Sequence, residues 1–293
     1  MTRTLRTLVD GIHFAEGPRW HEGRLWFSDF YKHSICSVGL GGDLRVELAV
    51  DDQPSGLGWM PDGSLLFVSM KKQQVWRRWP DGRVALHADL GGISVHMCND
   101  MVVAADGRAW VGNFGFDLDR TAREKGIEAI FADTPLARLA SVGPDGAVSV
   151  AAEGLAFPNG MVITPDGGTL IVAETFGMRL TAFDIAADGT LSNRRLWADT
   201  APRLPDGIAL DAEGAIWIAN PGAAECARIA EGGAVLETVP VGDTNCYACM
   251  LGGPEGRHLF MLCGPHSDAE KAAAAPLGAI LVTEVDVGRA GRP

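Results

Sequence analysis

The amino-acid sequence predicts an all-β protein, a six-bladed β-propeller whose four-stranded antiparallel blades surround a central channel, with residues 1–293 forming one domain. Three observations predict this fold. A short pattern occurs six times, the copies are 40 to 60 residues apart, and further strand candidates lie between them. Hydrophobic residues make up 47% of the chain and charged residues 21%, a balance typical of globular proteins.

Each copy of the pattern is an apolar run, a tight turn that ends in glycine, and a second apolar run. The copies are "EGPRWHEGRLWFSD" from Glu16, "SGLGWMPDGSLLFVSM" from Ser55, "NDMVVAADGRAWVGNF" from Asn99, "NGMVITPDGGTLIVAET" from Asn159, "DGIALDAEGAIWIAN" from Asp206 and "CMLGGPEGRHLFML" from Cys249. Asp-Gly or Glu-Gly between two apolar runs supplies the positive φ that a hairpin turn needs, so each copy is expected to be a β-hairpin. The segments 73–80 and 179–185 supply further strands, giving about four per copy.

The remaining segments complete the predicted ring. The opening strand at 3–10 and the closing strand at 278–285 are expected to share a blade. The one long interval, 60 residues between turn glycines, contains an insertion at about 115–140 whose middle has helical composition. Such an insertion lies over one face, either as a lid or as a plain surface excursion. In the fifth turn, Asp211 and Glu213 are expected to face solvent.

The residue that opens each copy marks one place in the repeat. Ser55, Asn99, Asn159 and Asp206 lie eight residues before their turn glycines, and Glu16 lies seven before its own; the sixth equivalent is Ala248 or Cys249. Equivalent positions in a radially repeated fold occupy equivalent places, so these side chains are expected to form a ring around the axis at one rim.

The ring indicates a metal site. Glu16, Asn99, Asn159 and Asp206 are oxygen donors, and carboxylates that converge with amides need a cation between them. An all-oxygen set selects one hard divalent cation, with Ca²⁺ first and Mg²⁺, Mn²⁺ or Zn²⁺ as alternatives. The other interpretation is that Asn and Asp before Gly only help a strand to begin. That interpretation predicts similar residues in every blade, whereas here they differ from blade to blade.

Several segments resemble motifs of the senescence marker protein, regucalcin and gluconolactonase family, over nearly the whole chain. They are "FAEGPRW", "PSGLGW", "NDMVVAADGRAWVGNF", "FPNGMVITPDGGTLIVAET", "LPDGIALDAEGAIWIAN" and "CMLGGPEGRHLF". The resemblance implies a six-bladed propeller, a divalent cation on the axis and usually the hydrolysis of lactones. It implies that Glu16, Asn159 and Asp206 bind the metal, that Asp206 is the catalytic base, and that Asn99 contacts substrate or a water on the metal.

One position departs from the family pattern. Sugar-lactone members carry an Arg two residues before the Asn of the third-blade motif, where it binds substrate hydroxyls, and this sequence has Met97 there. Without that guanidinium the site lacks a charged hydrogen-bond donor for the hydroxyl groups of polyhydroxylated rings. Together with the residues around Tyr247, Met97 indicates a more apolar pocket. The candidate substrate contacts are His96, Met97, Asn99, Asp100, Cys246 and Met250, although strand alternation would turn Asp100 back into its blade.

The sequence therefore predicts a metal-dependent lactonase or esterase-type hydrolase, a carboxylic ester hydrolase, acting on a lactone less polar than an aldonolactone. The cation would polarise the carbonyl, and Asp206 would accept a proton from the attacking water. A nearby dication lowers the pKa of a carboxylate, so attack by a water on the metal, steered by Asp206, is the variant. Two alternatives stay open: an esterase or carbonyl-polarising enzyme of the same fold on an apolar substrate, and a non-catalytic calcium-binding or protein-docking propeller.

Charge and composition limit the kinds of partner and the cellular compartment that are expected for this protein. The formal net charge of −12 disfavours nucleic acid and anionic membranes as partners, which leaves a small-molecule substrate and a monomer or small homo-oligomer. No segment approaches the roughly 18 apolar residues of a membrane span, and a cytoplasmic location is expected. Six cysteines are consistent with reduced thiols, and a single Cys246-x-x-Cys249 pair is weak support for zinc or redox chemistry.

Overall fold

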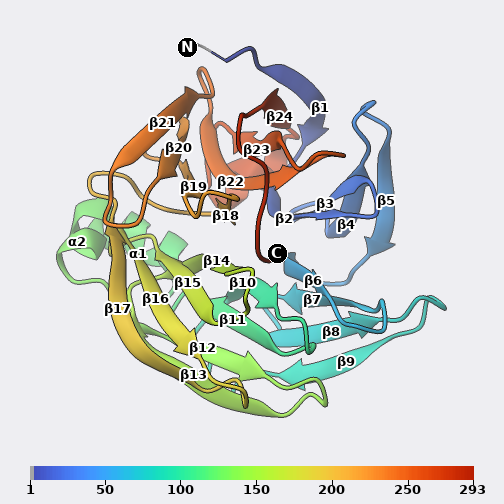
Figure 1. Cartoon of the computed structure of the whole chain (residues 1–293), viewed down its shortest axis with the longest axis vertical. Coiled ribbons are helices and arrows are strands. Elements are labelled where there is room, and N and C mark those ends of the chain that lie inside the picture. Colours follow the sequence, from blue (N-terminus) through green and yellow to red (C-terminus); the bar gives the residue numbers. More distant parts are fainter. Residues whose placement is uncertain (1–2) are drawn as a thin grey trace.

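Six four-stranded antiparallel sheets stand around one axis in the computed structural model, which describes residues 3–293 (Figure 1). In five of the sheets the four strands follow one another in the chain, and the first strand lies nearest the axis. The predicted propeller and its four-stranded blades are confirmed.

The first three blades contain strands β2 to β13. They are β2 (Ala15–His21), β3 (Arg24–Asp29), β4 (Ser34–Val38) and β5 (Leu44–Ala49); β6 (Pro54–Trp59), β7 (Leu65–Ser69), β8 (Gln74–Arg78) and β9 (Val84–Asp89); and β10 (Cys98–Val103), β11 (Ala109–Asn113), β12 (Ala137–Val142) and β13 (Val148–Leu155).

The last three blades contain the remaining strands. They are β14 (Pro158–Ile163), β15 (Thr169–Glu174), β16 (Arg179–Ile185) and β17 (Leu191–Asp199); β18 (Ile208–Leu210), β19 (Ile216–Asn220), β20 (Glu225–Ile229) and β21 (Val235–Pro240); and β22 (Asn245–Gly252), β23 (His258–Gly264), β24 (Gly278–Glu284) and β1 (Arg6–Ile12).

The sixth blade joins the two ends of the chain. β1 pairs antiparallel with β24, with Arg6 opposite Val282 and Ile12 opposite Gly278. β24 in turn pairs with β23. The opening and closing strands therefore share the last blade, as the sequence predicted, and β1 is its outermost strand.

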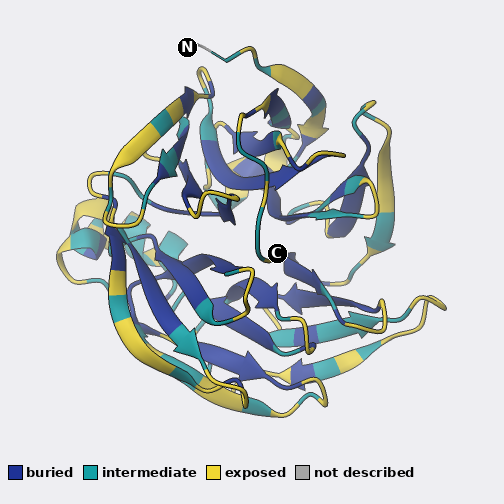
Figure 2. Cartoon of the chain, viewed as in Figure 1, coloured by how far each residue is buried: buried dark blue, intermediate teal, exposed yellow. Residues whose placement is uncertain are grey.

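The core consists of six hydrophobic clusters, one between each pair of neighbouring blades. Phe27 of the first blade and Phe260 of the sixth, for example, are fully buried in one of them. Burying a side chain of this size contributes about 1.5–3 kcal/mol. Figure 2 shows the result: the inner strands are almost entirely buried, while outer strands such as β5, β13 and β17 carry exposed residues.

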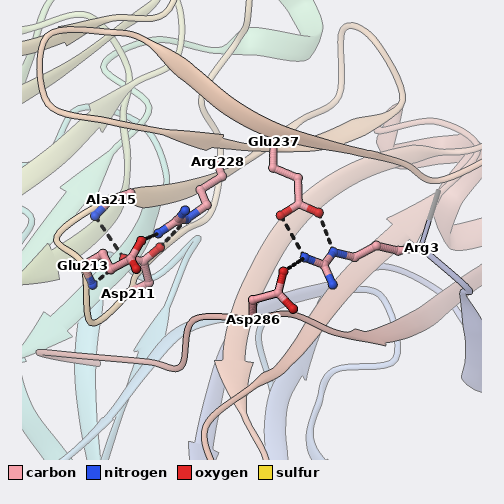
Figure 3. A network of polar contacts seen from close by, with 7 residues as sticks. All are labelled: Arg3, Asp211, Glu213, Ala215, Arg228, Glu237 and Asp286. Carbon is pink, nitrogen blue, oxygen red and sulfur yellow. Dashed lines mark hydrogen bonds and ion pairs between the residues drawn. The ribbon is translucent and has the colours of Figure 1, made fainter. Parts of the chain in front are cut away.

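The turns follow the predicted chemistry, with one correction. All six turn glycines have positive φ, from 70° at Gly256 to 90° at Gly107. Asp211, however, is fully buried and does not face solvent. Its Oδ1 accepts hydrogen bonds from the main-chain N–H groups of Glu213 and Ala215, and its Oδ2 accepts one from Arg228 Nε at 2.6 Å (Figure 3). The prediction failed because the Asp211 side chain folds back over its own hairpin; Glu213 is exposed, as predicted.

The predicted insertion contains two short helices, α1 (Leu118–Lys125) and α2 (Ile127–Ala132). Asp117 caps α1 by accepting a hydrogen bond from Arg120 N–H at 3.0 Å. The insertion packs through Phe116 and Ile130 onto Phe157, two residues before Asn159, so it lies at the rim where the inner strands begin. A third helix, α3 (Ala269–Ala274), was not predicted, although its sequence is rich in alanine.

The C-terminal tail crosses the other end of the inner strands. Arg289 N–H donates to Gly256 O, Ala290 N–H to Leu210 O, and Arg292 N–H to Ile163 O, at 2.9 to 3.0 Å. These acceptors lie in blades six, five and four, and the chain ends close to the axis in Figure 1. No helix within residues 3–293 has the length and apolar character to span a membrane.

A candidate metal centre at the rim of the propeller

A recurring β-bulge places the ring residues at the start of the inner strands. In the fourth blade Pro158 pairs with Glu174 but Met161 pairs with Val172, so two residues, Asn159 and Gly160, face one residue of β15. The same shift of one residue occurs in β2, β6 and β10. Bulges of this kind re-aim a side chain, and here they break the strand alternation at the place that the repeat singled out.

A chain of hydrogen bonds connects the ring from the second blade to the fifth. Ser55 Oγ donates to Asn99 Oδ1 at 3.1 Å, and Asn99 Nδ2 donates to Asn159 Oδ1 at 3.3 Å. Asn159 Nδ2 donates to Thr175 Oγ1 at 3.1 Å, and Thr175 Oγ1 donates to the carbonyl of Pro205, the residue before Asp206. These bonds therefore link the ring positions Ser55, Asn99 and Asn159 to the main chain before Asp206 and fix the two amide side chains.

The two carboxylates of the ring are buried and close enough to affect each other. Glu16 is 7% exposed and Asp206 is 9% exposed. Burial raises the pKa of Glu16 well above its usual range, and the negative charges of Asp206 and Asp100 raise it further. Burial likewise raises the pKa of Asp206, and the charge of Asp100 adds to this. A positive charge between them would relieve both effects.

The sixth ring residue is Tyr247, which corrects the prediction of Ala248 or Cys249. Gly160 N–H donates to Asp206 O, and in the next blade Gly207 N–H donates to Tyr247 O, so Tyr247 stands where Asp206 stands one blade earlier. Its ring packs on Phe14 at 4.8 Å between centroids. Burial raises the pKa of Tyr247 to about 12, so its hydroxyl is neutral at pH 7.

Asp100 occupies a place that is glycine in four other blades. The equivalents of Asp100 are Gly17, Gly56, Gly160 and Gly207. A Cβ at Gly160 would lie 2.6 Å from Ile208 N, which shows how closely the inner strands approach there. The Asp100 side chain is 4% exposed, and its Oδ1 has no hydrogen-bond partner within the described residues. Because of the bulge, Asp100 lies near Glu16 and Asp206, whose pKa values its charge raises.

The other predicted substrate contacts have different surroundings. His96, with φ of 62°, places its Nε2 at 3.6 Å from Asp117 Oδ2 of the insertion. Met97 is half-buried against the cluster that contains Phe14 and Tyr247. Cys246 and Met250 pack in the clusters on either side of the sixth blade. Cys249 is likewise a buried residue with a free thiol.

The residues of the ring fit a hard divalent cation. Glu16, Asp100 and Asp206 supply buried carboxylates, and one oxygen of Asp100 lacks a partner among the described residues. Within residues 3–293 no three His, Cys, Asp or Glu side chains lie close enough together to hold a metal ion, so at most two of these carboxylates could bind one cation, and amide oxygens would supply the further donors. Asn159 turns its Nδ2 to Thr175, which leaves its Oδ1 on the ring side. An all-oxygen set of this kind is typical of Ca²⁺ sites and less suited to Zn²⁺.

The rim above the ring is largely apolar. The residues two positions before the ring are Phe14, Gln53, Met97, Phe157, Leu204 and Asn245. Phe157 packs on Phe114 and Phe176, with centroids 4.8 and 5.0 Å apart. Two surface pockets, of about 310 Å³ beside Trp76 and about 580 Å³ beside Trp110, contain none of the ring residues.

Sequence reasoning missed two participants besides Tyr247. Thr175 holds Asn159 from the residue that directly follows the second strand of the blade, β15. Arg19 is buried three residues after Glu16. The repeat itself carried the signal for Arg19, because the equivalent residues Gly58, Val102 and Val162 are uncharged.

Comparison with known proteins gives a consistent result. Residues 14–264 match the family described as the SMP-30/Gluconolactonase/LRE-like region. The chain is 26% identical to a pentonolactonase of Haloferax volcanii, over 99% of this chain and 97% of that protein. It is 25% identical to a 6-deoxy-6-sulfogluconolactonase of Pseudomonas putida, over 67% and 64%. A regucalcin from Agrobacterium tumefaciens, described as a calcium-binding protein, superposes with a TM-score of 0.79 at 22% identity, covering 100% of this chain and 97% of that one.

Proposed function

Because the chain belongs to the SMP-30/Gluconolactonase/LRE-like family, we propose that it is a divalent-cation-dependent hydrolase that opens the ring of a lactone. We propose further that this lactone is less polar than an aldonolactone. The observation that carries the proposal is the ring of oxygen donors with buried carboxylates at the axis. The two relatives named as lactonases support the reaction class.

The proposed roles follow from the chemistry of each side chain. Glu16, Asn159 and Asp206, with Asn99, would hold the cation, for which Ca²⁺ is the first choice. When bound, the cation supplies Lewis-acid polarisation of the lactone carbonyl. Asp206 accepts a proton from the attacking water. Burial raises the pKa of Asp206 in the cation-free chain, whereas a bound cation would lower it, so Asp206 would either accept the proton or only orient the attacking water.

The apolar rim supports the proposed substrate class. Phe14, Met97, Phe157 and Leu204 lie two residues before the ring positions of four blades, so they would line the approach to the ring. Met97 presents a thioether where sugar-lactone members carry a guanidinium, so hydroxyl groups on a substrate ring would lose a charge-assisted partner. An alkyl or aryl substituent would instead bury its surface against these side chains.

A substrate panel tests the proposal. Proton release would be followed with sugar, alkyl and aromatic lactones, with Ca²⁺ and with a chelator. We expect the highest kcat/KM for an alkyl or aromatic lactone and loss of turnover with the chelator. Tight cation binding without hydrolysis of any lactone would contradict the proposal and favour a non-catalytic cation-binding propeller.

Asp206→Asn tests the role of the base. Asn keeps an oxygen donor and removes the proton acceptor, so we expect cation binding to weaken but persist while turnover falls about 10²–10⁴-fold. Asp166→Asn, in an exposed turn of the fourth blade, is the matched control and should leave turnover unchanged. Near-normal turnover of Asp206→Asn would rule out the assigned role. Calorimetry with Ca²⁺ and single-turnover kinetics measure the two effects.

A further inference from the structure

Arg19 is a buried cation directly beneath the candidate metal centre. It lies on β2, three residues after Glu16, and is 7% exposed. The equivalent residues in the next three blades are Gly58, Val102 and Val162. The repeat therefore does not require a charged residue at this place, and Arg19 is a departure that belongs to the first blade.

The guanidinium spans three blades. Its Nε donates to Leu57 O at 2.9 Å in the second blade, its Nη1 donates to Pro18 O at 2.6 Å in its own blade, and its Nη2 donates to Met101 O in the third. Arg19 can reach the third blade because β6 approaches β10 closely. A Cβ at Gly56 would lie only 2.3 Å from Met101 N.

The bonds of Arg19 go to main-chain carbonyl oxygens, which leaves the guanidinium charge unmatched by a direct carboxylate partner. The bond to Met101 O places the guanidinium beside the residue that follows Asp100. Burial raises the pKa of Asp100 and of Glu16, and the positive charge of Arg19 offsets part of this rise in both. A fixed charge in a dry site acts strongly on its neighbours, because little water is present to screen it. Arg19 thus acts on the ring through space.

The charges of the site then fit one particular class of ion. When a bound cation keeps Glu16, Asp100 and Asp206 ionised, these three buried carboxylates and the guanidinium of Arg19 together leave two net negative charges. One divalent cation neutralises them, and a trivalent ion would leave a buried positive charge.

We propose that Arg19 is a built-in counter-charge of the ring, a positioning residue that adjusts the site to one divalent cation and disfavours trivalent ions. The inference rests on the cation site of the proposed function, but not on any lactone. It predicts that the chain without this charge binds cations more tightly, which is the opposite of what loss of a purely structural residue would do.

Cation titrations of the full chain test the inference. Dissociation constants for Ca²⁺ and Tb³⁺ would be measured by calorimetry and terbium luminescence, without substrate. For Arg19→Met we expect about tenfold tighter Ca²⁺ binding, and a gain for Tb³⁺ that is about 1.5 times larger on the logarithmic scale, because the interaction scales with ion charge. Arg19→Gln removes the charge but keeps donors for the carbonyl groups, and it carries the same expectation if Arg19→Met does not fold.

Two further variants separate charge from packing. Arg19→Lys keeps the charge and loses the fork of donors, so its melting temperature should fall while both dissociation constants stay near those of the wild type. Arg228→Met breaks the buried ion pair with Asp211 in the fifth blade and should lower stability without changing either constant. Unchanged or weaker binding in both Arg19→Met and Arg19→Gln would overturn the inference while leaving the proposed function intact. A wild-type chain that binds neither ion would overturn both.

Discussion

Glu16 is a carboxylate whose ionisation the fold opposes until a cation compensates for its burial. Because burial raises its folded-state pKa, the folded chain holds this proton more tightly than the unfolded chain, in which the pKa is about 4.3. Without a divalent cation, the contribution of Glu16 to stability is therefore fully present below about pH 4. It is lost as the pH rises through the folded-state pKa.

Glu16→Gln should remove this pH dependence. In chelator, the free energy of unfolding of the variant should match that of the wild type near pH 4.5 and exceed it increasingly toward pH 8, as measured by urea denaturation. Glu213→Gln changes an exposed side chain and should show no such trend. If the wild type were the more stable protein at pH 8 in chelator, the burial argument would be wrong.

Counting residues within the repeat predicted five of the six ring positions. It failed at Tyr247 because the count allowed only seven or eight residues before the turn glycine. Tyr247 lies nine residues before Gly256, whereas Asn159 lies eight before Gly167. The burial of Asp211 was also invisible, since it depends on Arg228, a partner on another strand.

At the scale of elements, the insertion is attached to the propeller through aromatic side chains. Phe176, on the loop after β15, contacts Phe131 of α2 and Phe157 of the rim, with centroids 5.3 and 5.0 Å apart. The polar helix α1 has no buried residue of its own. Its position therefore depends on the aromatic contacts of its neighbours.

Phe176→Ala should loosen the insertion more than the propeller. Phe176 is only half-buried, so we expect a loss of about 2 kcal/mol or less in global stability, together with faster tryptic cleavage at the basic residues of α1. Limited proteolysis with mass spectrometry measures the cleavage. Leu136→Ala, an exposed apolar residue of the same insertion, is the control. Equal cleavage rates in all three proteins would show that the aromatic contacts do not hold the insertion.

Sequence patterns predicted elements well where the signal is local. The segment 179–185 is β16, and the helical composition of the insertion became α1 and α2. The bulges could not be predicted, because a bulge is a relation between two strands and each inner strand reads as regular by itself. Asp100 illustrates this: strand alternation alone would turn it into its blade, whereas the bulge interrupts that alternation and its charge raises the pKa of Asp206.

At the scale of the whole molecule, the ring is held closed by pairing between the two ends of the chain. β1, the outer strand of the sixth blade, buries Leu8 and Ile12 in the cluster between the sixth and first blades. Arg3 adds polar contacts, because its Nη2 donates to Glu237 of the fifth blade at 3.0 Å and to Asp286 at 2.9 Å (Figure 3). The described N-terminal segment thus joins two blades and the segment that follows β24.

Deleting residues 1–12 should open this closure. Loss of two buried apolar side chains removes about 3–6 kcal/mol, which should lower Tm by roughly 10 °C and expose the edge of β24 to aggregation. Calorimetry and light scattering measure these effects. Arg3→Ala, which removes only the partly exposed ion pairs, should cost about 1 kcal/mol or less. A truncated chain with the Tm of the wild type would show that closure does not depend on β1.

The overall architecture could be predicted because the repeat spacing and the strand count are global properties of the sequence. The path of the C-terminal tail could not, since residues 288–292 pair with the ends of three inner strands that their own sequence does not specify. The identity of the substrate cannot be predicted from the repeat either, because it depends on the side chains of the rim.

The shared blade of β1 and β24 also has a consequence for biosynthesis. The ribosome makes β1 first and its partner last, roughly 270 residues later, which at about 5–20 residues per second is an interval of about 15–50 s. Throughout that time the nascent chain carries an unpaired strand. Five blades can form hairpin by hairpin as they emerge, whereas the last can be completed only after release of its C-terminal segment from the exit tunnel. The nascent β1 segment "RTLVDGI" is expected to resist aggregation during this interval, because its charged and glycine residues make it a poor template for pairing with other chains.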